Sequence, residues 1–474
     1  MSKALWTSTE AALATDGDVK SDWSAVGVSI DTRSLDLGDL FVALIGDNSD
    51  GHKHVKDALA KGAAAAMVSG PCDGVSDEGL LVVEDTLSGL QALGHAARAR
   101  TDAKIVAVTG SVGKTSTKDA LRTILEAQGR THGSVASYNN HWGVPLTLAR
   151  MPADTEWGVF EIGMNHANEI TPLSQMVQPD VAIITTVEPV HLANFENVEG
   201  IADAKAEIFD GLKPDGTAIL NADNSHFDRL RLRAQTAGAG NVISFGASDK
   251  ADARLERVAL HPSCSCISAS ICGQAITYKL GIPGKHHVMN SLAILAAVHA
   301  LGADLALAGM TLATLNAPKG RGERHIVHDG DRQFVVVDES YNANPASMRA
   351  AIATLGAAEV EGAGRRVAVL GDMLELGEDE ALMHQGLAGP LADAGIDQVY
   401  ACGPLMKNLY EDLPAACKAG YAEGSEALLE QLASQLGDGD VVMVKGSLGS
   451  RMGLIVDGLL ALHSDDDVPS GAGD

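Results

Sequence analysis

Short apolar runs alternate with amphipathic segments along almost the whole chain of 474 residues. This alternation constrains the fold strongly, because strands connected by helices form layered α/β structures with largely parallel sheets. Several runs consist almost entirely of Val, Ile and Ala, as in strands that helices cover on both faces. The expected strands are 104–109, 158–162, 181–187, 217–221, 333–338, 366–370, 398–402 and 440–445, and the expected helices include 88–100, 115–128 and 288–301.

Changes in composition divide the sequence into three blocks, in line with about 150 residues per domain. Residues 1–103 form a small leading unit, residues 104–316 hold a glycine-rich turn, and residues 317–463 form a final α/β unit. The segment PKGRGER (318–324) is rich in Gly and Pro, as in a hinge between the second and third blocks. Residues 464–474 are acidic and Gly-rich, which predicts a disordered tail. We therefore expect an α/β protein of three domains.

The net charge disfavours two classes of partner. Lys and Arg number 35 against 62 Asp and Glu, giving −27, whereas nucleic acids and anionic membranes attract a basic face. The first residues lack the apolar core of a signal peptide, and no run of about 18 apolar residues predicts membrane insertion. Six cysteines without C-x-x-C spacing indicate a reducing compartment, so we expect a cytoplasmic protein. No coiled-coil pattern suggests an assembly, and a monomer is the default expectation.

The most specific motif is a glycine-rich turn between an expected strand and an expected helix. It reads Gly110-Ser111-Val112-Gly113-Lys114-Thr115-Ser116. This is a shortened P-loop, because Val108 stands at the first glycine position. Backbone N–H groups in such a turn surround phosphate oxygens, and the helix N-terminus adds partial positive charge. Lys114 suits the terminal phosphates and the Thr115 hydroxyl suits Mg²⁺. The alternative is a plain strand–helix connection, and the order of strand, turn and helix favours nucleotide binding.

With this turn, the chain resembles the Mur ligase family, the ATP-dependent amide-forming enzymes of peptidoglycan synthesis. Further matches follow in the family's order: DTRSLDLGDLFVALIGDNSDGH (31–52), EIGMNHANEI (161–170), EPVHLANFENVEGIADAKAEIF (188–209), GKHHVMNSLAI (284–294), KGRGER (319–324), DESYNANPASM (338–348), LGDMLELG (370–377) and VKGSLGSRM (444–452). The resemblance implies a small N-terminal uridine-nucleotide domain, a central P-loop ATPase-type parallel sheet and a C-terminal Rossmann-like α/β domain. As departures, KGSLGSRM replaces a more common KGSRG-type ending, and HKHV stands where a phenylalanine often follows DGH.

The resemblance also implies a site for ATP and two Mg²⁺ ions. Glu161 ends an expected strand on the side of the glycine-rich turn, and a carboxylate there is a hard ligand that suits Mg²⁺. Considered alone, a loop histidine is more often structural and a helix lysine is usually solvated. The resemblance instead makes His191 a metal ligand and Lys205 a carbamylated lysine that holds the second ion. The expected metal ligands are Thr115, Glu161, His191 and Lys205, and the expected catalytic residues are Lys114, Glu161, His191, Lys205 and Arg321.

Other matching positions imply contacts with ATP and with the acceptor substrate. By resemblance, Asn290 contacts the adenine amino edge, and Arg321 and Asp338 meet the γ-phosphate and the ribose when the C-terminal domain closes. The alternative for Arg321 is a mobile surface arginine in a linker. The residues expected to bind the acceptor are Thr32 and Arg33 of the leading block and Asn139 and Asn140 of a substrate-side loop.

Within the family, DESYNANPASM and LGDMLELG resemble the member that joins D-alanyl-D-alanine to UDP-N-acetylmuramoyl tripeptide through an acyl phosphate. The expected partners are therefore small molecules: the UDP-muramoyl tripeptide, the dipeptide and ATP. One alternative is the ligase that adds diaminopimelate or lysine, but its usual D-N-P-R is absent. A folylpolyglutamate-type relative is disfavoured by the uridine-type leading block. A GTP-dependent switch would need an N-K-x-D motif, and the sequence has none.

Overall fold

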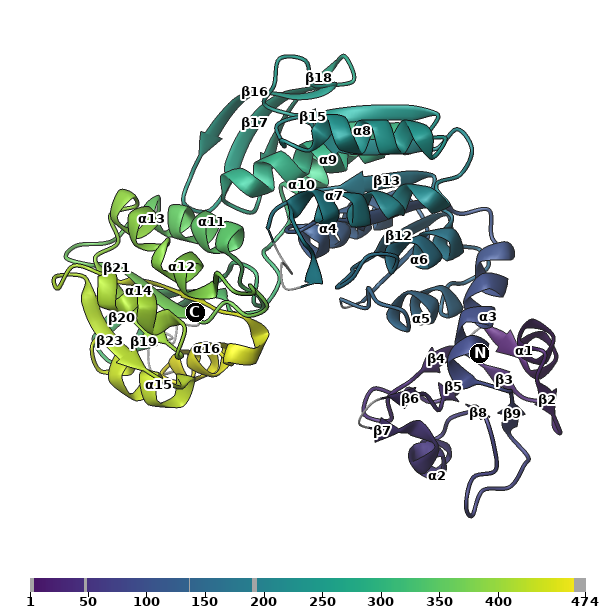
Figure 1. Ribbon diagram of the computed structural model, residues 1–474. Helices are drawn as coiled ribbons and strands as arrows, with labels where there is room; N and C mark the ends of the chain where they lie inside the picture. The colour runs from purple at the N-terminus through teal and green to yellow at the C-terminus, as the bar shows by residue number, and fades with distance from the viewer. Residues whose placement is uncertain (1–3, 47–48, 136, 190–193, 464–474) are drawn as a thin grey trace, which may run out of the picture.

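Three sheets, each built from one stretch of chain, form three units that lie along an arch in the computed structural model (Figure 1). The structure describes residues 4–46, 49–135, 137–189 and 194–463, so the predicted tail lies outside the described residues. The N-terminal and C-terminal units lie at the two ends of the arch, and the central unit lies between them. The expected α/β class with three domains is confirmed, while the boundaries at 103 and 316 stay predictions.

The N-terminal unit holds a five-stranded sheet in the order β2-β9-β8-β5-β4, which is parallel except for β2. Two further strand pairs, β1 with β3 and β6 with β7, are antiparallel. The elements are β1 (Trp6–Thr7), α1 (Ser8–Thr15), β2 (Asp18–Val19), β3 (Ser24–Ala25), β4 (Gly27–Ser29), β5 (Asp39–Val42), β6 (Ile45–Gly46), β7 (Ser49–Asp50), α2 (Val55–Ala60), β8 (Ala65–Val68), β9 (Leu80–Val82) and α3 (Thr86–Ala99).

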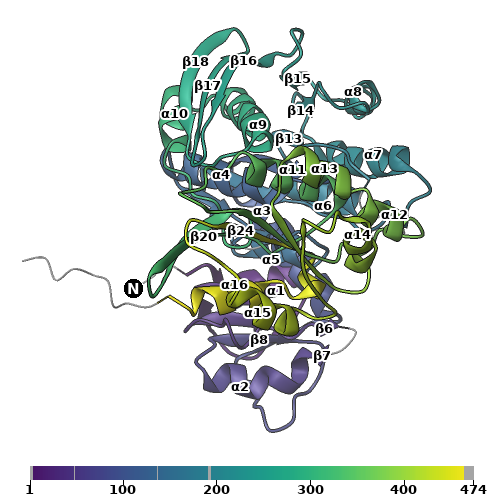
Figure 2. The same ribbon diagram turned by 90° about the vertical axis from the view of Figure 1, so that its left-hand side faces the viewer.

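The central unit holds a nine-stranded sheet in the order β11-β12-β10-β13-β14-β15-β16-β17-β18. The strands from β11 to β16 are parallel, and β17 and β18 add an antiparallel extension, which lies at the end of the molecule opposite β8 and α2 (Figure 2). The strands are β10 (Lys104–Thr109), β11 (Thr131–Gly133), β12 (Trp157–Glu161), β13 (Val181–Ile184), β14 (Thr217–Asn221), β15 (Asn241–Gly246), β16 (Ala253–Leu260), β17 (Ser265–Ile271) and β18 (Gln274–Leu280). The helices are α4 (Lys114–Glu126), α5 (Gly143–Ala149), α6 (Ile170–Val177), α7 (Val198–Ala206), α8 (Phe227–Thr236), α9 (Lys285–Leu301) and α10 (Leu305–Leu312).

Helices cover the central sheet on both faces, which explains its continuous apolar strands. In β10, Val106 and Val108 pack in the core with α4, α9 and α10, whereas Ile105 and Ala107 pack in the core with α5, α6, α7 and α8. Every residue of this strand after Lys104 is therefore buried. None of the helices in the described part of the chain combines the length and the apolar character that a membrane crossing requires.

The strand order of the central sheet positions the candidate site. From β10 the chain runs to β11 and β12 on one side and then to β13 on the other side of β10. Ligands of open α/β sheets bind beyond the carboxyl ends of the strands at such a change of direction. The loop after β10, Glu161 at the end of β12 and the residues after β13 therefore lie at one edge of the sheet.

The C-terminal unit holds a six-stranded sheet in the order β19-β20-β24-β21-β22-β23, which is parallel except for β19. One face packs against α11, α13 and α14, and the other against α15 and α16. The elements are β19 (Glu323–Asp329), β20 (Arg332–Glu339), α11 (Pro345–Gly356), β21 (Arg366–Gly371), α12 (Glu380–Gln385), α13 (Ala388–Asp393), β22 (Gln398–Cys402), α14 (Met406–Asp412), β23 (Lys418–Ala422), α15 (Ser425–Ala433), β24 (Val441–Lys445) and α16 (Gly453–Leu460).

The N-terminal and central units are joined by directed polar contacts. Trp6 Nε1 donates a hydrogen bond to the carbonyl oxygen of Ala149 over 2.8 Å. The Arg100 guanidinium lies 4.1 Å from the Trp6 ring and donates to the carbonyl oxygens of Leu5 (2.8 Å) and Met151 (3.0 Å). Because these bonds have defined directions, they fix the orientation of one unit on the other.

Candidate active site

The glycine-rich turn adopts a backbone conformation that requires its glycines. Gly110 has φ +147° and Gly113 has φ +85°, and a Cβ atom at position 110 would lie 2.0 Å from Thr185 Oγ1. The Thr185 hydroxyl donates to the carbonyl oxygen of Val112 over 2.6 Å, and Ser111 is bonded to the segment after β13. α4 begins at Lys114 without a side-chain cap, so its first backbone N–H groups are available to an anion.

Lys114 lies at the first turn of α4 with its ammonium group folded onto the glycine-rich turn. Its Nζ donates to the carbonyl oxygen of Gly110 over 2.6 Å. Desolvation lowers the pKa of Lys114; the Glu161 carboxylate raises it in part, and the positive charge of Arg321 lowers it further. A cation with this bond to a neutral carbonyl retains donors for a phosphate group.

Glu161 supplies a buried carboxylate beside the turn. Its side chain is 1% exposed, and Oε1 accepts a hydrogen bond of 2.7 Å from Asn139 Nδ2. Oε2 is buried and has no hydrogen-bond partner within the described residues. Because an unpaired buried carboxylate oxygen is costly, this atom fits a cation as its missing partner.

Lys205 lies near the end of α7 and is only 2% exposed. Its ammonium group makes no hydrogen bond or ion pair with a residue that the structure describes. Burial lowers the pKa of Lys205 well below its usual value, and the charge of Lys114 lowers it further. The interpretation of Lys205 as a solvated helix lysine is therefore wrong, because its side chain points into the protein.

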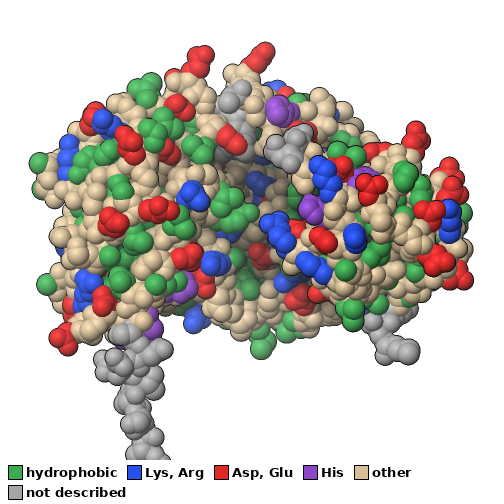
Figure 3. Space-filling view, turned by 90° about the horizontal axis from the view of Figure 1, so that it is seen from below, with side chains coloured by type: hydrophobic (Ala, Val, Ile, Leu, Met, Phe, Trp, Pro, Cys, Tyr) green, Lys and Arg blue, Asp and Glu red, His purple; other side chains and the backbone are tan. Residues whose placement is uncertain are grey.

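A cleft of about 580 Å³ lies between the central and C-terminal units, beyond the carboxyl ends of β10 and β12. Seen from below, the surface is hollowed between the two lobes, with Lys and Arg side chains in the hollow and along its rim (Figure 3). The predicted residues that line the cleft are Ser111, Val112, Gly113, Lys114, Thr115, Ser116, Asn139, Glu161, Asn290 and Arg321. Asn290 contacts the turn closely, since a Cβ atom at Gly113 would lie 2.5 Å from its Nδ2.

Arg321 enters the cleft from the segment that joins the central and C-terminal units. The guanidinium carbon lies 4.2 Å from the centroid of the Tyr341 ring, and the group makes no hydrogen bond or ion pair with the residues described. The segment is not a loose linker. The Gly320 backbone N–H donates to Asp338 Oδ2 (2.9 Å), and the Gly322 N–H donates to the carbonyl oxygen of Asp338 (2.7 Å). Arg321 is therefore part of the C-terminal unit.

Asp338 and Glu339 have different surroundings although they are adjacent. Asp338 is 1% exposed, is not among the residues that line the cleft, and accepts from Ser340 N–H (3.0 Å) and Ser340 Oγ (2.6 Å) as well as from Gly320. Both of its oxygens thus have partners, and its ribose contact stays a prediction. Glu339 lines the cleft and accepts from Lys445 Nζ over 3.2 Å.

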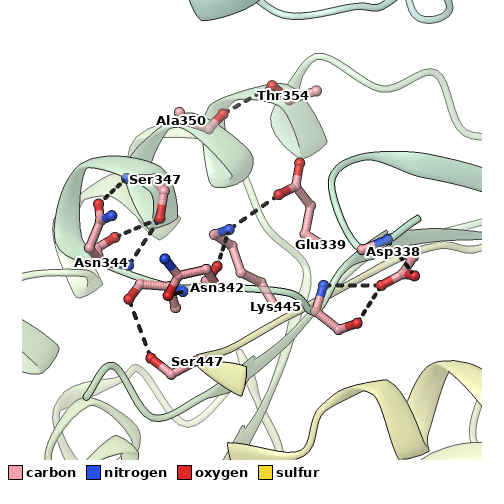
Figure 4. A network of polar contacts seen from close by, with 12 residues as sticks. Asp338, Glu339, Asn342, Asn344, Ser347, Ala350, Thr354, Lys445 and Ser447 are labelled. Carbon is pink, nitrogen blue, oxygen red and sulfur yellow. Dashed lines mark hydrogen bonds and ion pairs between the residues drawn. The ribbon is translucent and has the colours of Figure 1, made fainter. Parts of the chain in front are cut away.

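Glu339 and Lys445 are paired in register at the carboxyl ends of the parallel strands β20 and β24. Lys445 Nζ also donates to the carbonyl oxygen of Asn342 over 2.9 Å, so it lies between two groups of the connection from β20 to α11 (Figure 4). The same connection leads to Asn344, whose side chain caps α11. The pair fixes this connection along the wall of the cleft.

Besides Asp338, the predicted residues that are not among those lining the cleft are Gly110, Lys205, Asn140, Arg33 and Thr32, and one predicted residue is not described. Asn140 Oδ1 accepts from the Gly143 backbone N–H (3.0 Å) and so orders the start of α5. The Arg33 side chain is 88% exposed and bonds to Asp31, and the carbonyl oxygen of Thr32 accepts from Lys61. Both belong to the N-terminal unit, at the other end of the arch. His191 lies outside the described residues.

The residues of the cleft fit a hard cation. No group of three or more His, Cys, Asp or Glu side chains with metal-binding geometry occurs in the described ranges. The predicted ligand set does not need one, because it combines Glu161 with the Thr115 hydroxyl, a modified Lys205 and His191. The unpaired Oε2 of Glu161 is the observation in favour of the cation.

The cleft is also lined by residues that the sequence did not single out, among them Glu339, Tyr341 and Lys445. Glu339 and Tyr341 belong to the segment DESYNANPASM, and Lys445 ends an expected strand. Glu339 and Lys445 lie at the carboxyl ends of two expected strands, and this placement of opposite charges was a sequence signal for their ion pair. No sequence signal distinguished Asp338 from Glu339.

Comparisons with known proteins agree over most of the length of the chain. Three family models match: "Mur ligase family, catalytic domain" at residues 25–113, "Mur ligase middle domain" at 108–298 and "Mur ligase, glutamate ligase domain" at 320–448. The UDP-N-acetylmuramoyl-tripeptide–D-alanyl-D-alanine ligase of Rickettsia prowazekii is 32% identical, covering 96% of this chain and 99% of the relative. The ligase of the same name from Bacillus subtilis is 34% identical over 92% and 93%.

Solved structures show the same arrangement. A crystal structure of MurF from Acinetobacter baumannii matches with a TM-score of 0.83 and 29% identity, covering 96% of this chain and 99% of that one. The structure of a Thermotoga maritima MurF ligase in complex with ADP matches with a TM-score of 0.76 and 25% identity over 92% and 97%. Both matches include all three units.

Proposed function

Because the chain belongs to the Mur ligase family, we propose that it joins D-alanyl-D-alanine to UDP-N-acetylmuramoyl tripeptide with consumption of ATP. The observation that carries this proposal is the near-complete match to ligases of that name at 30–34% identity. The cleft at the switch point of the central sheet suits the ATP that such a ligase uses.

The reaction needs an activated acyl group, because a carboxylate is a poor acyl donor at neutral pH. ATP transfers its γ-phosphoryl group to the terminal carboxylate of the tripeptide, which gives an acyl phosphate and ADP. The amine of the dipeptide attacks the acyl carbon, the tetrahedral intermediate collapses, and phosphate leaves. Lys114 and Arg321, from two units, both line the cleft and would supply positive charge to the transferring group.

We assign Glu161, Thr115, Lys205 and His191 to hold two Mg²⁺ ions. Bound there, Mg²⁺ would supply positive charge to the phosphate oxygens of ATP. The unpaired Oε2 of Glu161 supports this assignment. Asn139 orients the same carboxylate through its bond to Oε1 and leaves Oε2 without a protein partner among the described residues.

Lys205 is assigned as the carbamylated lysine. Its neutral amine attacks CO₂, a nitrogen–carbon bond forms, and one proton leaves the nitrogen, so that a cation is replaced by a carbamate with two oxygen ligands. The burial of the side chain and its lack of a partner among the described residues support the assignment. A carbamate also removes the repulsion between Lys205 and Lys114.

The remaining assignments follow the three units. The turn from Gly110 to Ser116 holds the phosphates and Asn290 the adenine, while Asp338 fixes the segment that carries Arg321 and is our candidate for the ribose. In this proposal, residues 1–103 bind the uridine nucleotide through Thr32 and Arg33. Residues 104–316 bind ATP, with Asn139 and Asn140 near the acceptor, and residues 317–463 form the C-terminal ligase domain. We propose that the protein acts as a monomer in the cytoplasm.

The test is a phosphate-release and product assay with a panel of amines. Release should require UDP-muramoyl tripeptide and D-alanyl-D-alanine together. Better turnover with free diaminopimelate or lysine and the dipeptide-level precursor would assign another activity within the family. Release with nucleotide alone would indicate a hydrolase or switch. Lys114→Ala should reduce turnover by about 10²-fold or more, because the turn loses its cation.

A further inference from the structure

Two cations of different units, Lys114 and Arg321, line the same cleft. Lys114 comes from α4 of the central unit and Arg321 from the segment before β19. Such a pair is unfavourable unless something stabilises each cation. Lys114 has the carbonyl oxygen of Gly110 and the Glu161 carboxylate in the same cleft, whereas Arg321 has no acceptor among the described residues.

The group that stabilises Arg321 is the face of an aromatic ring. The guanidinium carbon lies 4.2 Å from the centroid of Tyr341, within the range of a cation–π contact. Both residues line the cleft. A carboxylate partner would occupy the N–H donors of the guanidinium, whereas a stacked ring leaves those donors free in the plane of the group. The arrangement therefore holds the cation and keeps its hydrogen-bonding edge available to phosphate oxygens.

The backbone brings the ring and the guanidinium together. The Tyr341 N–H donates to the carbonyl oxygen of Gly320 over 3.1 Å. Gly320 has φ +74°, and a Cβ atom there would lie 2.9 Å from the Tyr341 Cβ, so only glycine permits this approach without displacement. The Gly320 N–H is held in turn by Asp338 Oδ2. Arg321 and Tyr341 thus form one fixed pair within the C-terminal unit.

We infer that Tyr341 is a positioning residue for the ligase reaction: its ring face orients the Arg321 guanidinium towards the γ-phosphate. The inference rests on the proposed function, because it concerns the same phosphoryl transfer. The ring, and not the phenolic hydroxyl, performs this role. Tyr341 acts through Arg321, so its effect depends on the presence of that side chain.

The first test compares Tyr341→Leu, which removes the ring, with Tyr341→Phe, which keeps it. Tyr341→Leu should lower kcat by about 2- to 30-fold, the range that corresponds to a cation–π contact, and leave the KM for the UDP-muramoyl tripeptide unchanged. Phenylalanine should restore most of the turnover that leucine loses. Tyr410→Leu is the matched control, because Tyr410 also lies under a cation, Lys418 at 5.5 Å, but on α14. It should keep wild-type kcat.

The second test is a double-mutant cycle. In the Arg321→Ala background, Tyr341→Leu should cause no further loss of kcat. Additive losses, or a loss with phenylalanine equal to that with leucine, would overturn the inference. Unchanged kcat in Tyr341→Leu would overturn it as well.

A binding measurement separates this inference from the proposed function. The ratio of ATP to ADP affinity, measured by calorimetry, should fall in Tyr341→Leu by a factor similar to the loss of kcat. This ratio does not depend on which amine the enzyme accepts. If the wild type ligates another amine, the proposed function is wrong. The double-mutant cycle can then still be measured with that amine. An unchanged ratio in Tyr341→Leu would contradict the role of Tyr341 itself.

Discussion

At the scale of single residues, the surroundings of Lys205 do not favour a charge. Its side chain is 2% exposed, Lys114 adds a like charge, and no anion among the described residues compensates it. A buried, unpaired ammonium group is costly, and the usual outcomes are deprotonation or chemical change. The proposed carbamylation would resolve this cost, because it would convert the ammonium group into an anion beside the expected metal ions.

The first prediction concerns Lys205→Ala. If the carbamate holds Mg²⁺, this variant should lose activity while its thermal midpoint stays near that of the wild type. Formate or acetate at high concentration should restore part of the activity, because a small carboxylate can supply the same hard oxygens. Acetamide, of similar size but neutral, should not.

The matched control is Lys114→Ala. No carboxylate should rescue this variant, because the substitution removes a positive charge that an anion cannot replace. Full activity of Lys205→Ala without any additive would contradict the carbamate.

His132 gives a prediction about pH. Desolvation lowers its pKa to about 4, while its ring N–H donates to the carbonyl oxygen of Thr147 over 2.7 Å. Below about pH 6.5 the unfolded chain binds a proton at His132 that the folded chain does not bind. The contribution of the neutral His132 to the free energy of unfolding is therefore fully present above pH 6.5 and is lost as the pH falls towards 4. The loss should be about 2 kcal/mol by pH 5. His132→Gln should unfold with a weaker pH dependence between pH 8 and 5.

The measurement is thermal unfolding at several pH values. His166→Gln, at an exposed histidine, is the control and should keep the wild-type dependence. An equal pH dependence in His132→Gln and the wild type would show that His132 does not carry the effect.

At the scale of elements, the glycine-rich turn is limited by contacts on both sides. Thr185 approaches Gly110, and Asn290 approaches Gly113, so the turn has no room for side chains at these positions. The sequence predicted the turn and its neighbours well, because a strand covered on both faces has a continuous apolar run. The strand expected at 181–187 ends at Ile184, since Thr185 turns to bond with Val112.

The prediction for this element is Gly113→Ala. Alanine disfavours φ +85°, and its Cβ would lie 2.5 Å from Asn290 Nδ2. Either the turn or Asn290 must move, and the affinity for a non-hydrolysable ATP analogue should fall by about tenfold or more. Calorimetry measures the change. Gly389→Ala, where no atom lies within 4 Å of the added Cβ, should bind the analogue like the wild type. Equal affinities would contradict the assigned position of the phosphates.

Other elements could not be predicted from the same patterns. The strands of the N-terminal sheet are two to four residues long, too short for a periodic signal. The antiparallel strands β16, β17 and β18 mix buried and exposed residues and lack the apolar runs of the parallel strands. Among site residues, motif matching identified Lys114 and Glu161, whereas the burial of Lys205 and the pair of Arg321 with Tyr341 depend on tertiary packing.

At the scale of the whole molecule, the two joints of the arch differ. Arg100 and Trp6 hold the N-terminal unit on the central unit through bonds to backbone carbonyl oxygens. The C-terminal unit instead meets the central unit across the cleft. The segment at 318–324, expected from its Gly and Pro content to be a hinge, is fixed to the C-terminal unit by Asp338.

The last prediction concerns the first joint. Arg100→Met leaves the carbonyl oxygens of Leu5 and Met151 without their donor, and it should lower the stability of this joint by about 2–4 kcal/mol. The first transition in scanning calorimetry should therefore move to lower temperature. Arg229→Met removes an exposed ion pair with Asp203 and should leave the transition near that of the wild type. A transition that moves equally in both variants would contradict the role of Arg100.

The pair of cations at the cleft makes nucleotide occupancy and domain arrangement thermodynamically linked. Lys114 and Arg321 belong to different units and line the same cleft, and because like charges repel, arrangements that separate the two side chains lower this repulsion. A triphosphate bound between them, as we propose, would compensate both charges. The coupling is reciprocal. If the triphosphate favours the arrangement that brings the cations together by a certain factor, that arrangement binds the triphosphate more tightly by the same factor. The bound nucleotide would thus act as the counter-ion of both cations, and the relative position of the two units would depend on whether it is bound.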